Sequence, residues 1–144
     1  MDYQVGNVGR AIVARLENGE PVLEALVELV RREDIRAAVV YLLGGVQKGK
    51  IVVGPEREEL PPTPEWRDLV ESHETLAVGT VFWEGEEPKI HLHGAYGKKD
   101  EVRVGCLRQQ ADTFIVMEVV ILELTGITAV RALDPVSNMS LLTF

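Results

Sequence analysis

The stretch that decides the fold is KIHLHGAYGKKDEVRVGCL, residues Lys89–Leu107. Polar and apolar residues alternate in both halves, and Gly97-Lys98-Lys99-Asp100 between them has the composition of a tight turn. Successive side chains of a β-strand point to opposite faces, so a period of two is typical of a strand. The stretch therefore predicts an antiparallel hairpin with strands over Lys89–Tyr96 and Glu101–Leu107.

Further strands are predicted on both sides of this hairpin. The expected strands are Val8–Leu16, Ile35–Leu43, Val46–Val53, Thr75–Trp83, Thr113–Leu124, Thr128–Leu133 and Met139–Phe144. Gly44-Gly45 is expected to end the strand Ile35–Leu43 and to separate it from the strand Val46–Val53. Several consecutive strands with short connections indicate an antiparallel sheet.

Helical periodicity is confined to a small part of the chain. Pro21 suits the first position of a helix, and apolar residues recur at 3.6 spacing from Val22 to about Arg32. Thr63-Pro64-Glu65-Trp66 favours a short second helix through Val70. One main helix beside a run of antiparallel strands predicts an α+β fold.

Length and composition narrow the class of protein. A chain of 144 residues predicts a single domain over residues 1–144. The longest apolar run, Ala37–Leu43, is too short to cross a bilayer, and the first residues do not resemble a signal peptide. A single cysteine excludes an internal disulfide and favours the reducing cytoplasm. The net charge of −8 makes direct DNA binding unfavourable, because DNA affinity depends on Lys and Arg.

His91, His93 and Cys106 are the candidate metal ligands. Two histidines one residue apart in a strand share a face, and a cysteine on the neighbouring strand can supply a third donor for zinc or a similar metal. A four-residue loop, Gly97–Asp100, would place His91 opposite Cys106. A two-residue loop, Lys99-Asp100, would place His93 opposite Cys106, whereas a three-residue loop would put the cysteine on the wrong face.

Other interpretations of these residues stay open. The histidines can belong to a solvated strand face, with Cys106 as a small buried apolar residue. If they do hold a metal, three protein ligands leave a fourth position for water, a small anionic ligand or a group from a neighbouring subunit. His73 is available as a fourth ligand, although an ordinary polar role at a strand start is the simpler expectation.

Glu118 is the candidate catalytic residue. It interrupts the apolar run Phe114–Leu122, and a carboxylate in such surroundings is expected to be paired or to have a raised pKa. It can orient a histidine ligand or act as a general base on metal-bound water. The alternative is that Glu118 faces solvent or pairs with an arginine such as Arg103 or Arg108.

The chain resembles the plants and prokaryotes conserved (PPC) domain, which stands alone in bacteria and archaea and follows AT-hook segments in plants. The resemblance runs from about Gly9 to Phe144. It is carried by the following pieces in this order: Arg10, Gly19-Glu20-Pro21, Gly44-Gly45-Val46, Glu74–Thr80, Pro88–His93, Gly105-Cys106-Leu107, Glu118–Ile121 and Arg131–Asp134.

This resemblance implies an antiparallel α+β fold, a homotrimer, and a metal bound by the His-x-His pair with a third histidine. Cys106 occupies the position of that third histidine, so the implied site has a softer and more anionic donor set. The plant partner-binding segment Gly-Arg-Phe-Glu-Ile-Leu is matched only at Glu74 and Leu76, and the Arg-Gly-Arg-Pro core of an AT-hook is missing.

Three functions are compared on this basis. The first is a cytoplasmic, trimeric, zinc-binding module with an open site for a small ligand or a partner. The second is a zinc-dependent hydrolase or lyase with Glu118 as the base, which leaves open whether the protein is an enzyme. The third is a DNA-associated regulatory protein, which the net charge disfavours.

Overall fold

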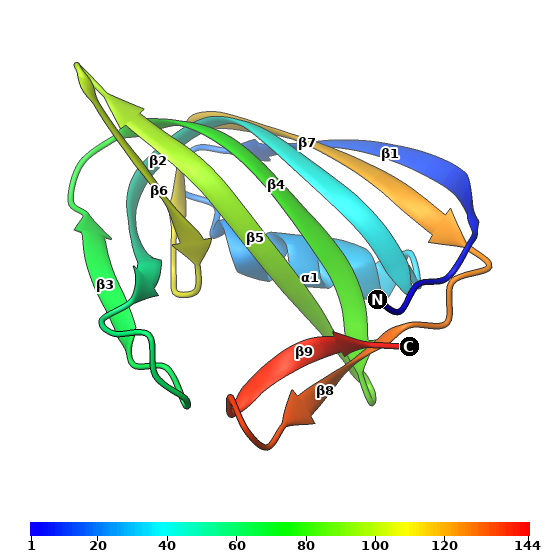
Figure 1. Cartoon of the computed structure of the whole chain (residues 1–144). Coiled ribbons are helices and arrows are strands. Elements are labelled where there is room, and N and C mark those ends of the chain that lie inside the picture. The colour runs from blue at the N-terminus through cyan, green and yellow to red at the C-terminus, as the bar shows by residue number, and fades with distance from the viewer.

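The structure is a computed structural model of residues 1–144, with nine β-strands and one α-helix (Figure 1). In chain order the elements are β1 (Asn7–Glu17), α1 (Val22–Arg32), β2 (Ala37–Pro55), β3 (Pro64–Leu69), β4 (His73–Glu84), β5 (Glu87–Lys98), β6 (Glu101–Leu107), β7 (Asp112–Thr125), β8 (Val130–Asp134) and β9 (Met139–Thr143). The expected antiparallel sheet with one main helix is therefore present, and strands make up most of the chain.

Seven strands form one antiparallel sheet in the order β1-β7-β2-β4-β5-β6, with β3 paired to β2. The long strand β2 bends the sheet back on itself. Its first half pairs with β4 and β7, whereas Ile51 and Val52 near its end pair with Leu107 and Cys106 of β6. The curl visible in Figure 1 therefore brings β6 against the far end of β2.

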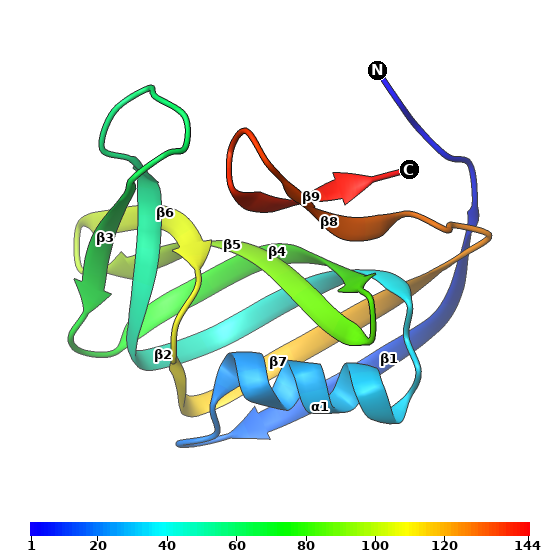
Figure 2. The ribbon, with the colours of Figure 1, turned by 90° about the horizontal axis from the view of Figure 1, so that it is seen from below.

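The helix and the terminal hairpin lie on opposite sides of the sheet (Figure 2). Val22, Leu26 and Val30 of α1 are fully buried, because their spacing places them on one side of the helix. They belong to a core of 20 buried residues that also includes Leu92 and Tyr96 of β5. The helix α1 lacks the length and the apolar character needed to cross a bilayer.

Most predicted strands are confirmed, each ending within two residues of its expected boundary. The prediction of a short helix after Thr63 was wrong, because Pro64–Leu69 form β3. The outer part of β2 extends beyond β4, and β3 pairs with it from Gly49 to Val52. Proline suits the first position of an edge strand as well as a helix start, so tertiary pairing decided between them.

The predicted break at Gly44-Gly45 was also wrong, because β2 continues through both glycines. The irregularity lies in the partner strand β7, where Gly44 pairs with Met117 and Gly45 pairs with Phe114. Ile115 and Val116 of β7 form the resulting bulge. A Cβ atom on Gly44 would lie 2.3 Å from the Val116 carbonyl oxygen, so these glycines permit the close approach of the two strands.

Arg10 of β1 forms an ion pair that links two strands and the end of α1. Its guanidinium donates to both carboxylate oxygens of Glu123 in β7, at 2.8 and 3.1 Å, and to the Glu33 carbonyl oxygen at 2.8 Å. The hydrogen bond and the charge of Arg10 lower the pKa of Glu123 from its ordinary value of 4.5. A carboxylate whose pKa is lower in the folded state stabilises the fold above its unfolded pKa.

This ion pair predicts a pH dependence of stability. The contribution of Glu123 should be complete above about pH 4.5 and should be lost as the pH falls through the lower folded pKa. Glu123→Gln should therefore be less stable than the wild type at neutral pH, and the difference should shrink in acid. Urea unfolding of both proteins from neutral to acid pH measures the difference in their free energies of unfolding. A difference that stays constant with pH would contradict the prediction.

Candidate metal site

The hairpin of β5 and β6 has the two-residue turn, which is the shorter of the two predicted turns that would bring the candidate metal ligands together. Lys98 pairs with Glu101, so Lys99 and Asp100 form a two-residue loop, and Lys99 adopts φ +54°. In this register His93 lies directly opposite Cys106. The four-residue loop with His91 opposite Cys106 was wrong, whereas the two-residue alternative is confirmed.

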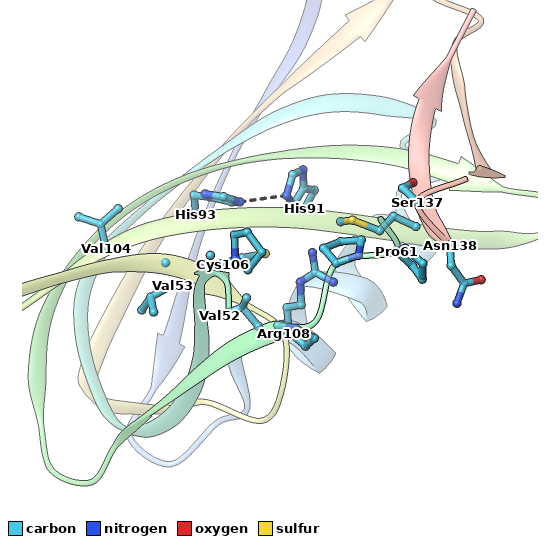
Figure 3. Close-up of a pocket in the computed structure, with 16 residues that line it drawn as sticks. Val52, Val53, Pro61, His91, His93, Val104, Cys106, Arg108, Ser137 and Asn138 are labelled. Atoms are coloured by element: carbon cyan, nitrogen blue, oxygen red, sulfur yellow. Dashed lines mark hydrogen bonds between the residues drawn. The ribbon is translucent and has the colours of Figure 1, made fainter. Parts of the chain in front are cut away.

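The three candidate ligands converge on one point (Figure 3). The Nε2 atoms of His91 and His93 lie 3.0 Å apart, and the rings meet edge to face with centroids 4.8 Å apart. The donor atoms of both histidines and the Cys106 sulfur all lie within 4.8 Å of one another. Ligands of one tetrahedral zinc ion are roughly 3.3–3.7 Å apart, so small side-chain rotations would bring this donor set into range.

The donor set fits a borderline-soft transition metal on chemical grounds as well. Two imidazoles and one thiolate are typical of zinc, whereas magnesium and calcium require oxygen donors. Cys106 is buried, whereas both histidines are exposed. A metal bound by all three side chains would therefore remain accessible to solvent on the side of the histidines. The chain supplies three ligands, which leaves one tetrahedral position for another group.

A cavity of about 610 Å³ opens in front of this cluster. Two connections form its walls: the proline-rich segment between β2 and β3, and the turn between β8 and β9. Both project from the side of the sheet opposite α1 (Figure 2). The lining residues are Val52, Val53, Gly54, Pro55, Pro61, Pro62, Pro64, His91, His93, Val104, Gly105, Cys106, Arg108, Ser137, Asn138 and Met139.

The electrostatics of the cavity favour a neutral His91. Partial burial lowers the pKa of the His91 imidazole, and the charges of His93, Arg131 and Arg108 lower it further. A neutral imidazole is the form that binds a metal. The surroundings of His91 therefore favour its ligand-competent state.

Arg131 of β8 lies beside the site, a position that the sequence analysis did not predict for it. Its side chain is buried, and its guanidinium donates to the Thr80 hydroxyl at 3.2 Å and to the Ser140 carbonyl oxygen at 3.4 Å. Thr80 is the cross-strand neighbour of His91, which places Arg131 beside the cluster. Burial lowers the pKa of Arg131, and the nearby Cys106 opposes that shift. A lone arginine in a short terminal strand carries no local signal of this position.

Glu118 lies on the same face of the sheet as the cluster but several strands away. It pairs with Leu43 of β2, which pairs with Leu76 of β4, which pairs with Ala95 of β5. Three spacings between neighbouring strands amount to roughly 14 Å. Glu118 is exposed and forms no ion pair with Arg103 or Arg108, so within one chain its catalytic role stays a prediction without geometric support.

His73 is not part of the cluster. It begins β4, where its Nδ1 atom lies 2.6 Å from the Glu71 carbonyl oxygen. The structure therefore brings together His91, His93 and Cys106 and leaves both His73 and Glu118 outside.

Comparison with known proteins finds relatives of the same architecture. A family model of the Plants and Prokaryotes Conserved domain matches residues 3–125. A metal-containing protein from Archaeoglobus fulgidus is 26% identical, with a TM-score of 0.88 over 100% of both chains. A plant- and prokaryote-conserved protein from Pyrococcus horikoshii is 25% identical, with a TM-score of 0.86 over 100% of this chain and 98% of its own.

A more distant relative shares the fold alone. It comes from Ralstonia eutropha and is named as a suspected DNA-binding protein. It is 20% identical, with a TM-score of 0.74 over 92% of this chain and 90% of its own. Comparison with curated proteins found no match.

Proposed function

Because this chain belongs to the Plants and Prokaryotes Conserved domain family, we propose that it is a metal-binding module in which His91, His93 and Cys106 hold one zinc ion. The observation that carries the proposal is the convergence of three donor atoms within 4.8 Å on a two-strand hairpin. The similar Archaeoglobus fulgidus protein is named as metal-containing, which supports the same interpretation. The proposed module is a single domain over residues 1–144.

The proposed role is binding or regulation. A zinc ion with three protein ligands supplies a Lewis-acid centre with an exchangeable fourth position. The chain surrounds that position with a cavity in which seven of the sixteen lining residues are valine or proline and none is a carboxylate that could act as a base. This lining favours ligand capture over hydrolysis or elimination. The net charge of −8 weighs against the DNA-associated alternative.

Elemental analysis of protein purified without a metal-affinity tag tests the proposal. We expect about one zinc per chain, released by a chelator and restored by titration with Zn²⁺. The sole cysteine, Cys106, must be reduced to serve as a ligand, in line with a cytoplasmic location. A protein that neither carries nor takes up a divalent transition metal would overturn the proposed function.

The assembly we propose is a homotrimer. The face of the sheet away from α1 carries an apolar patch of exposed side chains: Val13, Tyr41, Leu43, Leu76 and Val78. Their strands place Tyr41 beside Val78 and Leu43 beside Leu76, so the patch is continuous across β2 and β4. Continuous exposed apolar surface of this kind usually marks an interface.

A charge in this patch should prevent association. Leu76 is 63% exposed in one chain, so Leu76→Glu should leave the subunit folded while burying a carboxylate in the interface. We expect the wild type to sediment as a trimer and Leu76→Glu as a monomer. Val70→Glu, at an exposed aliphatic residue between β3 and β4, is the matched control and should stay trimeric. A Leu76→Glu variant with unchanged mass would place the interface elsewhere.

A further inference from the structure

The charges of the cavity differ from those of the chain around it. The protein contains 23 acidic residues and carries a net charge of −8. None of the sixteen cavity-lining residues is acidic, and apart from the two histidines the only basic one is Arg108. The only charged side chain that lines the cavity is therefore positive, although the protein as a whole is acidic.

Arg108 has no counter-ion within the chain. It follows β6 directly, is exposed, and takes part in none of the ion pairs or side-chain hydrogen bonds of the structure. Figure 3 shows its side chain reaching toward Pro61 and the two histidines. A guanidinium offers five N–H donors in a planar fork, so this one is free to bind an oxyanion in the cavity.

Arg131 adds a second positive charge without a carboxylate partner. It is only 9% exposed, and its two hydrogen-bond acceptors are neutral oxygens of Thr80 and Ser140. Its buried Nε atom has no hydrogen-bond partner at all. A buried charge left unpaired is costly, so an anion bound nearby would relieve an electrostatic imbalance that the chain itself does not correct.

The proposed metal, when bound, would increase the excess of positive charge at the site. A divalent ion held by two neutral imidazoles and one thiolate retains a net charge of about +1, which adds to the charges of both arginines. An acidic group entering the open metal position would neutralise part of this charge. With the metal bound, the site would therefore have both an open coordination position and an excess of positive charge.

The walls indicate which anion fits. Pro55, Pro61, Pro62 and Pro64 lack backbone N–H groups, and no lysine lines the cavity. Lysines and backbone N–H donors usually hold a phosphate group, and this lining has no lysine and includes four prolines without an N–H. A volume of about 610 Å³ suits a small molecule with an apolar body, which the valines and prolines can contact.

We propose that the cavity binds a small organic carboxylate, with the carboxylate between the metal and Arg108 and the apolar body against the proline-rich segment. This inference rests on the proposed metal site and names the class of its ligand. Arg131 contributes long-range positive charge from beside His91, whereas Arg108 contacts the ligand.

Calorimetric titration of the zinc-loaded protein tests the proposal. The probes are butyrate, benzoate and phenylacetate, with phenylacetamide as the neutral counterpart and phenyl phosphate as the phosphate counterpart. We expect at least one carboxylate to bind about tenfold more tightly than phenylacetamide and phenyl phosphate, because a charge-assisted pair is lost or poorly satisfied in both counterparts.

The variant Arg108→Gln should weaken carboxylate binding about tenfold while leaving the affinity for zinc unchanged. Arg57→Gln is the matched control, because Arg57 is an exposed arginine in the proline-rich segment between β2 and β3 but does not itself line the cavity. It removes the same charge from the chain and should leave carboxylate binding unchanged. Equal losses in the two variants would mean that only the overall charge matters, and would overturn the proposal.

The same titrations on metal-free protein separate the two proposals. Normal zinc uptake without any preference for a carboxylate over phenylacetamide overturns the ligand assignment and leaves the metal site standing. Absence of zinc uptake overturns the proposed function, and the metal-free titration then still decides whether Arg108 recognises a carboxylate. Tighter binding of phenyl phosphate than of every carboxylate would also overturn the assignment.

Discussion

Alanine at both His91 and His93 is expected to reduce zinc from about one ion per chain to none. Changing residues that merely orient metal ligands typically costs 10–100-fold in metal affinity, so removal of two ligands should cost more than about 100-fold. The two side chains are exposed, so the fold itself should survive the change. Elemental analysis and competition with a chelator, at equal protein concentration, measure the loss.

His73→Ala is the matched control for the double variant. It removes the chain's third histidine, whose Nδ1–H donates a hydrogen bond to the Glu71 carbonyl oxygen and which lies outside the cluster. Its zinc content should equal that of the wild type. Zinc retained at wild-type affinity in the double variant, or lost from His73→Ala, would show that the metal binds elsewhere on the chain.

Leu92→Ala is expected to cause the largest loss of folding stability near the site. Leu92 lies between the two histidines but points to the opposite face, where it is fully buried in the core beneath α1. Removing most of a buried leucine side chain lowers the free energy of unfolding by about 2–5 kcal/mol, because transfer energy is lost and a cavity remains. That is a large share of the roughly 5–15 kcal/mol that stabilises a typical domain.

Urea unfolding of the metal-free protein at one fixed chain concentration isolates this effect from metal binding and assembly. Val70→Ala, an exposed aliphatic truncation, should change the free energy of unfolding by less than about 0.5 kcal/mol. A Leu92→Ala variant within that same range would mean that the core around β5 is loosely packed.

Local patterns predicted most of the elements because backbone geometry produces them directly. Alternation over Lys89–Tyr96 and Glu101–Leu107 predicted β5 and β6, and 3.6 spacing from Val22 predicted α1. The two wrong elements lie where a distant strand intervened. Pro64–Leu69 form β3 because they pair with the outer part of β2. Gly44-Gly45 remain within β2 because the irregularity between β2 and β7 is a bulge in β7.

Some features of the candidate site likewise follow from local sequence patterns, whereas others depend on the tertiary structure. That His91 and His93 share a face follows from the period of a strand alone, and the cysteine on the next strand follows from the hairpin. Whether His91 or His93 lies opposite Cys106 depended on the turn, where Lys99 adopts a positive φ that its residue type did not predict. The walls of the cavity come from segments far apart in the sequence, so no local spacing could have assembled them.

By itself, then, the sequence determined an antiparallel hairpin carrying two histidines and a cysteine on one face, because side-chain direction in a strand depends only on neighbouring residues. Only the tertiary structure decided that Arg131 lies beside the cluster, that Arg108 faces the cavity without a counter-ion, and that Glu118 lies several strands away. The physical reason is that distances between remote segments depend on strand order, curl and register, which the whole chain sets cooperatively.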